Sequence, residues 1–291
     1  MPPQTVLVTG ASSGIGLATA LSLAESGFVV YASLRDLRRG DQLKQEAQQR
    51  GLTVHLVRLD ATEPESIRDA VDTIVSRSGG IYALVNNAGI IVRGYFEDVD
   101  EEEIRRVCDT NLFGSMAVTR AVLPHMRDAG EGRVVFISST AGRLASPGNS
   151  AYCVSKFALE GFGECLRQEV EPFGIFVSLV EPGFVKTELF GRNRNVSRRA
   201  EDPSSPYHSS FQRLEQLTDR EVRGAVIAPS AVGAVVRDIL TTRRPKMRYL
   251  VGRRPKLLFA LRRYLPGETF DRIWMRELGR RLRSGPKPEG A

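Results

Sequence analysis

The residues of this sequence best spaced for chemistry lie between Ser139 and Lys156. Tyr152 and Lys156 are four residues apart, so in a helix their side chains leave the same face one turn from each other. An ammonium group beside a phenol favours the phenolate and lowers the phenol pKa toward working pH. The pair therefore predicts a tyrosine that acts as a general acid or base, with Ser139 holding a substrate oxygen against it.

The same Tyr-x-x-x-Lys spacing also fits a solvated lysine one turn from a half-buried tyrosine, so the surrounding elements must decide. An apolar run over Arg133–Ser138 predicts a strand that ends at Ser139, and Tyr152–Gln168 reads as the next helix. Alternation of strands and helices along the chain predicts an α/β fold, a doubly wound, Rossmann-type parallel sheet of about seven strands. The expected strands are Thr5–Thr9, Phe28–Leu34, Thr53–Leu59, Ile81–Val85, Arg133–Ser138, Ile175–Val180 and Met247–Gly252.

A glycine-rich turn follows the first expected strand. Glycines allow a tight turn and a close approach of the backbone to a phosphate, and a helix beginning near Ser13 directs its amides and dipole at the anion. The alternative is a plain strand–turn–helix connection. We expect the turn to bind a dinucleotide through Gly10, Ser12, Ser13, Gly14, Ile15 and Gly16.

The end of the second expected strand indicates which dinucleotide is bound. An acid there would bind the ribose hydroxyls and repel a 2′-phosphate, but the sequence has Leu34 and Arg35 before the first acid, Asp36. A guanidinium pairs well with phosphate oxygens, so we expect NADP(H) in preference to NAD(H), unless Arg35 is only solvated beside Asp36. Asp60, after the third strand, is expected to accept a hydrogen bond from the adenine amino group.

An Asn-Asn-Ala-Gly turn follows the fourth expected strand. Asn87, Ala88 and Gly89 suit either a backbone approach to a ribose or a hydrogen-bond network that ties the strands together. The three histidines are scattered and the three cysteines lack the spacing of metal ligands, so no metal site is expected.

The length, composition and charge of the chain limit the classes of protein to which it can belong. With 291 residues and 42% hydrophobic residues, the chain is large enough for one α/β domain with an extension. The start enters a strand pattern at once and no apolar run reaches the length of a membrane span, so we expect a cytoplasmic protein, or one peripheral to a membrane. The net charge of +7 is uneven, because residues 237–291 carry +11 and the remainder −4.

Together, four motifs resemble the short-chain dehydrogenase/reductase family in order and spacing. They are Thr-Gly-x-x-x-Gly-Ile-Gly, Asn-Asn-Ala-Gly, Ser139 with Tyr152 and Lys156, and Pro182-Gly183 with Thr187. The resemblance spans about Thr5 to Gly252, and within the family the flanking segments look like the 17β-hydroxysteroid and retinol dehydrogenase branch.

The resemblance implies a set of roles. Asn111, which the helical region Asp98–Gly130 places mid-helix, matches the fourth catalytic member, which kinks the helix and holds a water that relays protons to the lysine. The residue-level alternative is a structural amide bonding its own backbone. Tyr152 donates the proton and Lys156 contacts the nicotinamide ribose, while the nicotinamide is covered by Pro182, Gly183, Val185 and Thr187. Many relatives pair through the helices around Asn111 and Tyr152, which implies a homodimer or homotetramer.

Two regions lie outside the motifs. We expect residues 1–252 to form the catalytic domain, with 188–228 as an irregular lid over the substrate. An apolar pocket is expected from Leu144, Phe190, Tyr207 and Phe211, which favours a lipophilic substrate. Residues 253–291 are expected to form a basic extension with a disordered end. One helical face of this extension carries Phe270, Ile273, Trp274, Leu278 and Leu282. This face is expected either to pack on the domain or on a partner subunit, or to lie on an anionic membrane surface.

These expectations define an NADP(H)-dependent oxidoreductase of a lipophilic ketone, aldehyde or alcohol, such as a steroid, retinoid or long-chain compound. The alternatives are a reductase of 3-oxoacyl thioesters on acyl carrier protein or coenzyme A, and a non-catalytic NADP(H) sensor. Such a sensor usually loses a catalytic residue, whereas all four are present here. Nucleic acid is not an expected partner, because the basic tail matches no recognised module.

Overall fold

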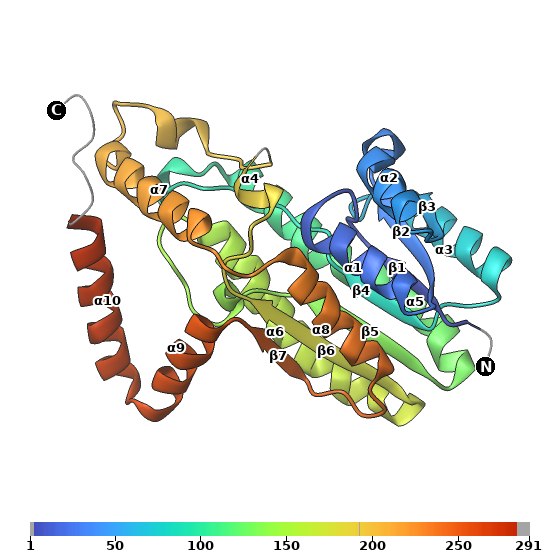
Figure 1. Ribbon diagram of the computed structural model, residues 1–291. Coiled ribbons are helices and arrows are strands. Elements are labelled where there is room, and N and C mark those ends of the chain that lie inside the picture. The colour runs from blue at the N-terminus through green and yellow to red at the C-terminus, as the bar shows by residue number, and fades with distance from the viewer. Residues whose placement is uncertain (1–2, 192, 284–291) are drawn as a thin grey trace.

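Seven parallel strands form one sheet in the order β3-β2-β1-β4-β5-β6-β7 (Figure 1). The computed structural model describes residues 3–191 and 193–283, with side chains at all of these positions except 190, 253–255 and 283. The central strands are apolar and β-branched, and β1 and β4 are buried along their whole length, as expected of a sheet covered on both faces. The strands are β1 Thr5–Val8, β2 Val29–Leu34, β3 Val54–Arg58, β4 Ala83–Asn86, β5 Gly132–Ile137, β6 Ile175–Pro182 and β7 Arg248–Val251.

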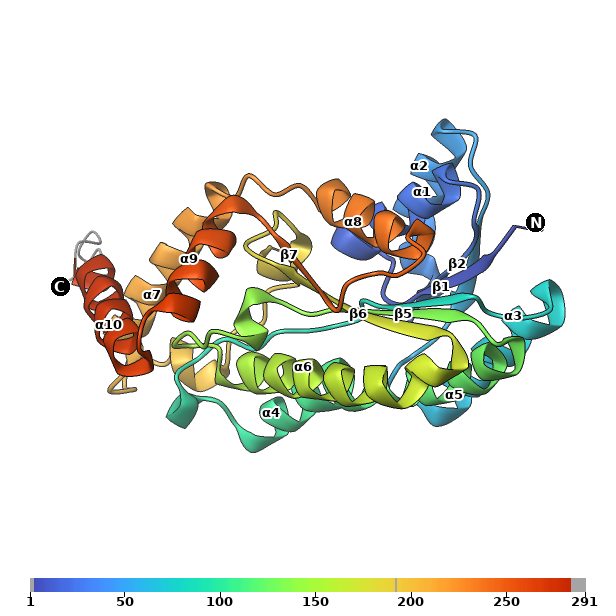
Figure 2. The same cartoon turned by 90° about the horizontal axis from the view of Figure 1, so that it is seen from below.

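Helices cover both faces of the sheet. Figure 2 shows α1, α2 and α8 on one face and α3 to α6 on the other. Leu21 of α1 and Val236 of α8 belong to one apolar core, and Ile74, Val122 and Leu159 to the second. The doubly wound parallel sheet is thereby confirmed. The helices are α1 Gly14–Glu25, α2 Asp41–Gln49, α3 Pro64–Ser78, α4 Glu101–Cys108, α5 Gly114–Ala129, α6 Ser150–Val170, α7 His208–Arg223, α8 Pro229–Thr241, α9 Arg253–Tyr264 and α10 Gly267–Arg283.

The long helix expected over Asp98–Gly130 is interrupted. Helix α4 ends at Cys108, a π-helical turn spans Asp109–Phe113, and α5 begins at Gly114. A side chain at position 114 would bring its Cβ within 2.9 Å of the Ala61 Cβ, so glycine lets this turn pack closely on the loop after β3. π-turns of this kind are common at functional sites.

The lid segment is more ordered than the sequence suggested. Within it lie two short turns and the 16-residue helix α7, which places Phe211, Leu214 and Thr218 on its buried face. The chain continues through α8 and β7 into α9 and α10, and α10 lies beside α7 at one end of the molecule (Figures 1 and 2). Within residues 3–191 and 193–283, no helix combines the length and the apolarity needed to cross a bilayer.

Candidate active site

The strand order reverses between β1 and β4, and open α/β sheets bind ligands at that point, beyond the carboxyl ends of the strands. A cavity of about 1490 Å³ lies there. Of the residues expected to bind coenzyme, those that line it are Gly10, Ser12, Ser13, Gly14, Ile15, Leu34, Arg35, Asp60, Asn87, Ala88, Gly89, Tyr152, Lys156, Pro182, Gly183, Val185 and Thr187. Among the described residues, Gly16 does not line the cavity. An added Cβ at this position would come within 2.5 Å of the Asn87 Nδ2, so the absence of a side chain allows close helix–strand packing.

The glycine-rich turn fits a diphosphate. Gly10 and Gly14 have φ angles of 65° and 58°, in the left-handed region that side chains disfavour. A Cβ on Gly14 would sit 3.2 Å from the Thr187 Cγ2, across the cavity wall. The Ser13 side chain makes no capping bond and the first turn of α1 has no acid, so the positive end of this helix is open to an anion.

The Asn-Asn-Ala-Gly turn ties two central strands together. Asn87 Nδ2 donates to the carbonyl oxygens of Thr9 and Gly10, both at 2.9 Å. The Thr9 hydroxyl accepts from the backbone amides of Asn87 (2.9 Å) and Ala88 (3.0 Å). The network that the sequence left as one of two possibilities is therefore present, and it fixes the floor of the cavity.

Ser139, Tyr152 and Lys156 meet in the same cavity. Ser139 follows β5 and caps a short turn, its Oγ accepting from the Ala141 amide at 3.1 Å. The Ser139 side chain lies near enough to Tyr152 to favour its phenolate, which lowers the pKa of Tyr152. Lys156, 5% exposed, donates from Nζ to the Ile137 carbonyl at 2.8 Å, and its Nζ lies 5.7 Å from the centre of the Tyr152 ring. The solvated-lysine interpretation of the motif does not hold.

Burial changes the expected protonation of this pair. It raises the pKa of Tyr152 to about 12, against the opposing effect of the hydrogen bond from Ser139. It lowers the pKa of Lys156 to about 8, and the carboxylate of Glu160, one helical turn further along, opposes that shift. The expectation of a depressed tyrosine pKa is therefore wrong for the protein without ligands, because desolvation of the phenol outweighs its neighbours. At neutral pH the phenol holds its proton, which is the form that a proton donor needs.

The shifted lysine predicts a pH-dependent cost to stability. Below pH 8 the folded protein holds a charged Lys156 in a buried site, and this cost disappears as pH rises from about 8 toward the ordinary lysine pKa near 10.5. Lys156→Met should therefore raise the free energy of unfolding by about 1–3 kcal/mol at pH 7, with the gain shrinking by pH 10. Urea denaturation at both pH values measures it. The exposed Lys44→Met is the control, and a gain that is equal at both pH values would contradict the assignment.

Asn111 lies in the π-turn and is fully buried. Its Nδ2 donates to the Ile90 carbonyl (2.9 Å) and to Ser155 Oγ (3.0 Å), and its Oδ1 accepts from the Ile90 amide (2.8 Å). Its side chain thus bonds the loop after β4 and helix α6, rather than its own helix. Asn111 does not line the cavity among the described residues, although Thr110 does, so it positions α6 at Ser155, the residue before Lys156.

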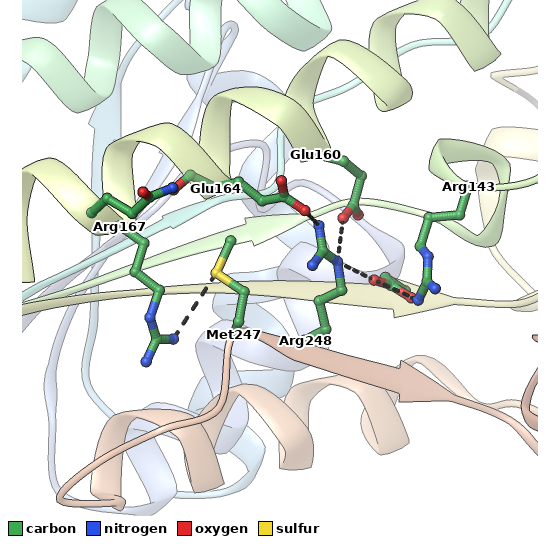
Figure 3. A network of polar contacts seen from close by, with 8 residues as sticks. Arg143, Glu160, Glu164, Arg167, Met247 and Arg248 are labelled. Atoms are coloured by element: carbon green, nitrogen blue, oxygen red, sulfur yellow. Dashed lines mark hydrogen bonds and ion pairs between the residues drawn. The ribbon is translucent and has the colours of Figure 1, made fainter. Parts of the chain in front are cut away.

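An ionic cluster around the buried carboxylates of Glu160 and Glu181 lies beside the site (Figure 3). Glu181, at the end of β6, is 0% exposed and pairs with Arg143 (3.1 Å) and Arg248 (3.1 Å). Arg248 also reaches Glu160 at 2.9 Å and Glu164, both on α6. Burial raises the pKa of Glu181, with a further contribution from Glu160. The cluster joins the segments that carry Ser139, Lys156 and Pro182, and sequence reasoning did not find it.

The substrate end of the cavity is apolar, but its wall differs from the expected one. Leu144 lines it, whereas Tyr207 and Phe211 are absent from the lining among the described residues. Phe211 is 3% exposed. The Tyr207 ring stacks on the Tyr95 ring, and the Phe211 ring meets Tyr95 edge to face. The side chain of Phe190 lies outside the described part of the chain. The wall is completed instead by Leu214 and Leu217 of α7, Leu257, Leu258 and Leu261 of α9, and Trp274 and Leu278 of α10.

The C-terminal extension therefore belongs to the site. Phe270 is 4% exposed, and Trp274, Leu278 and Leu282 are also partly covered, so the apolar stripe of α10 packs inward as one alternative foresaw. Ile273 departs from that expectation, being 53% exposed. Among residues 3–191 and 193–283, no group of three His, Cys, Asp or Glu side chains is arranged to hold a metal ion.

A buried arginine anchors the lid. Arg93, 1% exposed, follows the loop after β4 and pairs through Nε with Glu215 of α7. It also donates to Thr218 Oγ1 (2.8 Å) and to Asn149 Oδ1 (2.7 Å), just before α6. Burial, and then the charge of Arg194, lower the pKa of Arg93 to about 10. Sequence gave no signal for this contact, because its partners are 56 to 125 residues away.

The adenosine end of the cavity is basic. Arg35, Asp36 and Arg39 line it together with Leu34. Asp36 is paired with Arg38 at 2.9 Å and accepts from its amide at 3.0 Å, so this carboxylate is compensated. Arg39, which the sequence analysis did not name, donates to Asn193 of the lid at 3.3 Å. Asp60 also lines the cavity, and its Oδ1 accepts from Thr62.

A dinucleotide crevice that ends in a serine, a tyrosine and a buried lysine is the arrangement of an oxidoreductase of alcohols and ketones. Comparison with known proteins agrees. A family model described as short chain dehydrogenase matches residues 4–197, so the chain belongs to the short chain dehydrogenase family, whose members bind a nicotinamide coenzyme.

Individual relatives cover nearly the whole chain. The 3-ketodihydrosphingosine reductase of Bacteroides thetaiotaomicron is 38% identical over 89% of this chain and 92% of its own length. Retinol dehydrogenase 5 of Mus musculus is 34% identical over 92% of this chain and 86% of its own. A solved short-chain dehydrogenase from Streptomyces avermitilis, 33% identical, covers 94% of this chain and 98% of its own, with a TM-score of 0.77.

Proposed function

We propose that this protein transfers hydride between NADP(H) and a lipophilic ketone, aldehyde or alcohol, with Tyr152 as the general acid or base. The observation that carries the proposal is the position of Ser139, Tyr152 and Lys156 in one cavity, whose glycine-rich end fits a dinucleotide and whose other end is apolar. The names of two relatives, a ketodihydrosphingosine reductase and a retinol dehydrogenase, support a lipid substrate.

The side chains suit the reduction of a carbonyl. A bound nicotinamide coenzyme, held by the glycine-rich turn and the Pro182–Thr187 segment, supplies the hydride. The hydroxyls of Ser139 and Tyr152 hold the carbonyl oxygen, and Tyr152 gives it a proton as negative charge develops there. The charged Lys156 stabilises the resulting phenolate and favours recovery of a proton. In the oxidation direction Tyr152 accepts the proton instead.

We further propose that Arg35 and Arg39 bind the 2′-phosphate of NADP(H). The compensated Asp36 leaves two guanidinium groups facing this end of the cavity. Replacing both arginines with Gln should raise KM for NADPH about 10- to 100-fold, as expected for lost charge-assisted bonds, and change KM for NADH by less than about threefold. Arg68→Gln, on the exposed face of α3, is the control. Equal losses with both coenzymes would show that the arginines do not read the phosphate.

A substrate panel tests the proposed function directly. All-trans-retinal, a steroid ketone, 3-ketodihydrosphingosine and acetoacetyl coenzyme A are each offered with NADPH and with NADH, and coenzyme oxidation is followed at 340 nm, a wavelength at which reduced nicotinamide absorbs. Turnover of at least one lipid carbonyl with NADPH supports the proposal. Exclusive use of the thioester would favour the 3-oxoacyl reductase, and coenzyme binding without turnover of any compound would favour the sensor.

We also propose a homodimer or homotetramer. The outer face of α6 leaves Val154 and Phe157 58% and 42% exposed, and Phe113 of the π-turn is 57% exposed. Exposed apolar side chains on neighbouring helices are typical of a subunit interface. Sedimentation equilibrium measures the mass, and a monomer at micromolar concentration would contradict this proposal.

A further inference from the structure

Helices α9 and α10 carry apolar side chains that are exposed to solvent. On α9, Leu257, Leu261 and Tyr264 are 66%, 47% and 81% exposed, and their spacing of four and three residues places them on one face. On α10, Ile273 and Met275 are 53% and 63% exposed. These five side chains, which we call the apolar rim, belong to two adjacent helices, and Figure 1 shows both helices at one end of the molecule.

The rim is surrounded by positive charge. Residues 253–283 contain ten Lys and Arg against three Asp and Glu. Within the described residues, the exposed side chains of Lys256, Arg263 and Arg276 form no ion pair, while Glu277 is already paired with Arg280 and Arg281. Apolar side chains with unpaired cations beside them are what an interfacial helix presents to anionic lipid.

A hollow of about 590 Å³ opens beside the rim, lined by Arg143, Arg262, Arg263 and Tyr264 with Phe259 and Ala260. Aromatic rings support two of the guanidinium groups, since Arg143 lies 4.6 Å from the centre of the Phe259 ring and Arg262 lies 5.9 Å from that of Phe270. Arg143 is compensated by Glu181, so Arg262 and Arg263 give the hollow its net charge. Its size and its donors suit a phosphate group with a substituent.

We propose that α9 and α10 dock on an anionic phospholipid bilayer, with the apolar rim in the interface and a headgroup phosphate in the arginine-lined hollow. Leu257 and Leu261 also line the large cavity, so the docked face includes the mouth of the substrate site. A lipophilic substrate would then enter from the bilayer without crossing water, a consequence that rests on the proposed function. The docking itself does not depend on the proposed function.

The test is co-sedimentation of the full-length protein with vesicles of phosphatidylcholine alone, or of phosphatidylcholine with phosphatidylglycerol at 3:1. Binding should require phosphatidylglycerol and weaken at high salt, because the attraction is electrostatic and screened. Arg263→Gln with Arg276→Gln should reduce the apparent affinity at least about tenfold at low salt. Tyr264→Ser with Met275→Ser should reduce it by a similar factor, through loss of apolar insertion.

Matched changes elsewhere serve as controls. Arg68→Gln with Arg77→Gln removes two exposed charges from α3, and Phe173→Ser removes an exposed ring, 48% accessible, in the short turn after α6. Both should bind vesicles like the unaltered protein, with thermal unfolding used to check that every variant folds. The proposal is overturned if no vesicle is bound, if the rim and arginine variants bind normally, or if millimolar inorganic phosphate abolishes binding, which would identify a site for the free anion. Because the readout needs no turnover, its failure is distinct from failure of the proposed enzyme activity.

Discussion

Replacing Tyr152 with phenylalanine is expected to lower kcat for carbonyl reduction by about 10²- to 10⁴-fold, the usual contribution of a positioned general acid. The variant keeps the ring and loses only the hydroxyl, which lies in the cavity with Ser139. Because burial raises the phenol pKa to about 12, this hydroxyl is protonated across the neutral range, and it is the proton source in the proposed reaction. Substrate is therefore held without a proton donor in the variant.

The measurement that separates chemistry from binding is a pair of assays. Steady-state kinetics should show the loss in kcat, and titration of NADPH by fluorescence should give a dissociation constant within about threefold of the unaltered protein, since the glycine-rich turn is untouched. Tyr31→Phe is the matched control, because its hydroxyl also makes a buried contact, 2.9 Å from Ser78 Oγ, but lies outside the cavity wall. A Tyr152 variant that keeps more than about a tenth of kcat would remove Tyr152 from the catalytic role.

The parts of this site that could be predicted from sequence are those that depend on residues close together in the chain. The seven expected strands are all present, with ends displaced by at most two residues, because each is a short run rich in apolar residues between turns. The sequence also predicted the roles of Gly10, Gly14 and the Tyr152–Lys156 pair in this site, since their geometry depends on one turn or one helix. Helix α7 could have been found from the spacing of Phe211, Leu214 and Thr218, but Pro203 and Pro206 just before it suggested a loop.

What the sequence could not show depends on tertiary burial. The raised pKa of Tyr152 reverses an expectation based on one neighbouring charge, because the number of water molecules lost around a phenol is a property of the folded cavity. The substrate wall shifted from Tyr207 and Phe211 to α9 and α10 for a related reason. The amphipathic pattern of α10 gives its buried face but not the surface it meets. The contacts of Arg93 with α7 could likewise not be predicted, because only the folded chain brings these distant residues together.

Arg93→Met is expected to lower the free energy of unfolding by about 3–5 kcal/mol, the range for breaking a buried ion pair. Among residues 3–191 and 193–283, the change leaves Glu215 with Arg194 as its one cationic partner, and it takes a donor from Thr218 and Asn149. Arg58→Met is the control, since Arg58 makes an ion pair of 2.8 Å with Glu63, but the two side chains are 54% and 52% exposed. An exposed pair contributes about 0–1 kcal/mol, so urea denaturation should separate the two variants clearly.

The same variant should also report on the lid. Leu214 and Leu217 of α7 line the substrate end, and α7 is held to the loop before α6 through Arg93, so a loosened α7 should raise KM for the lipid carbonyl about tenfold. Affinity for NADPH should change by less than about threefold, because the coenzyme turn lies on β1 and α1. Adding Glu215→Leu to Arg93→Met should recover part of the lost stability, since the carboxylate that lost one of its two cationic partners is then gone. If the double variant is less stable by the full sum of the single changes, Arg93 and Glu215 act independently and the lid is anchored elsewhere.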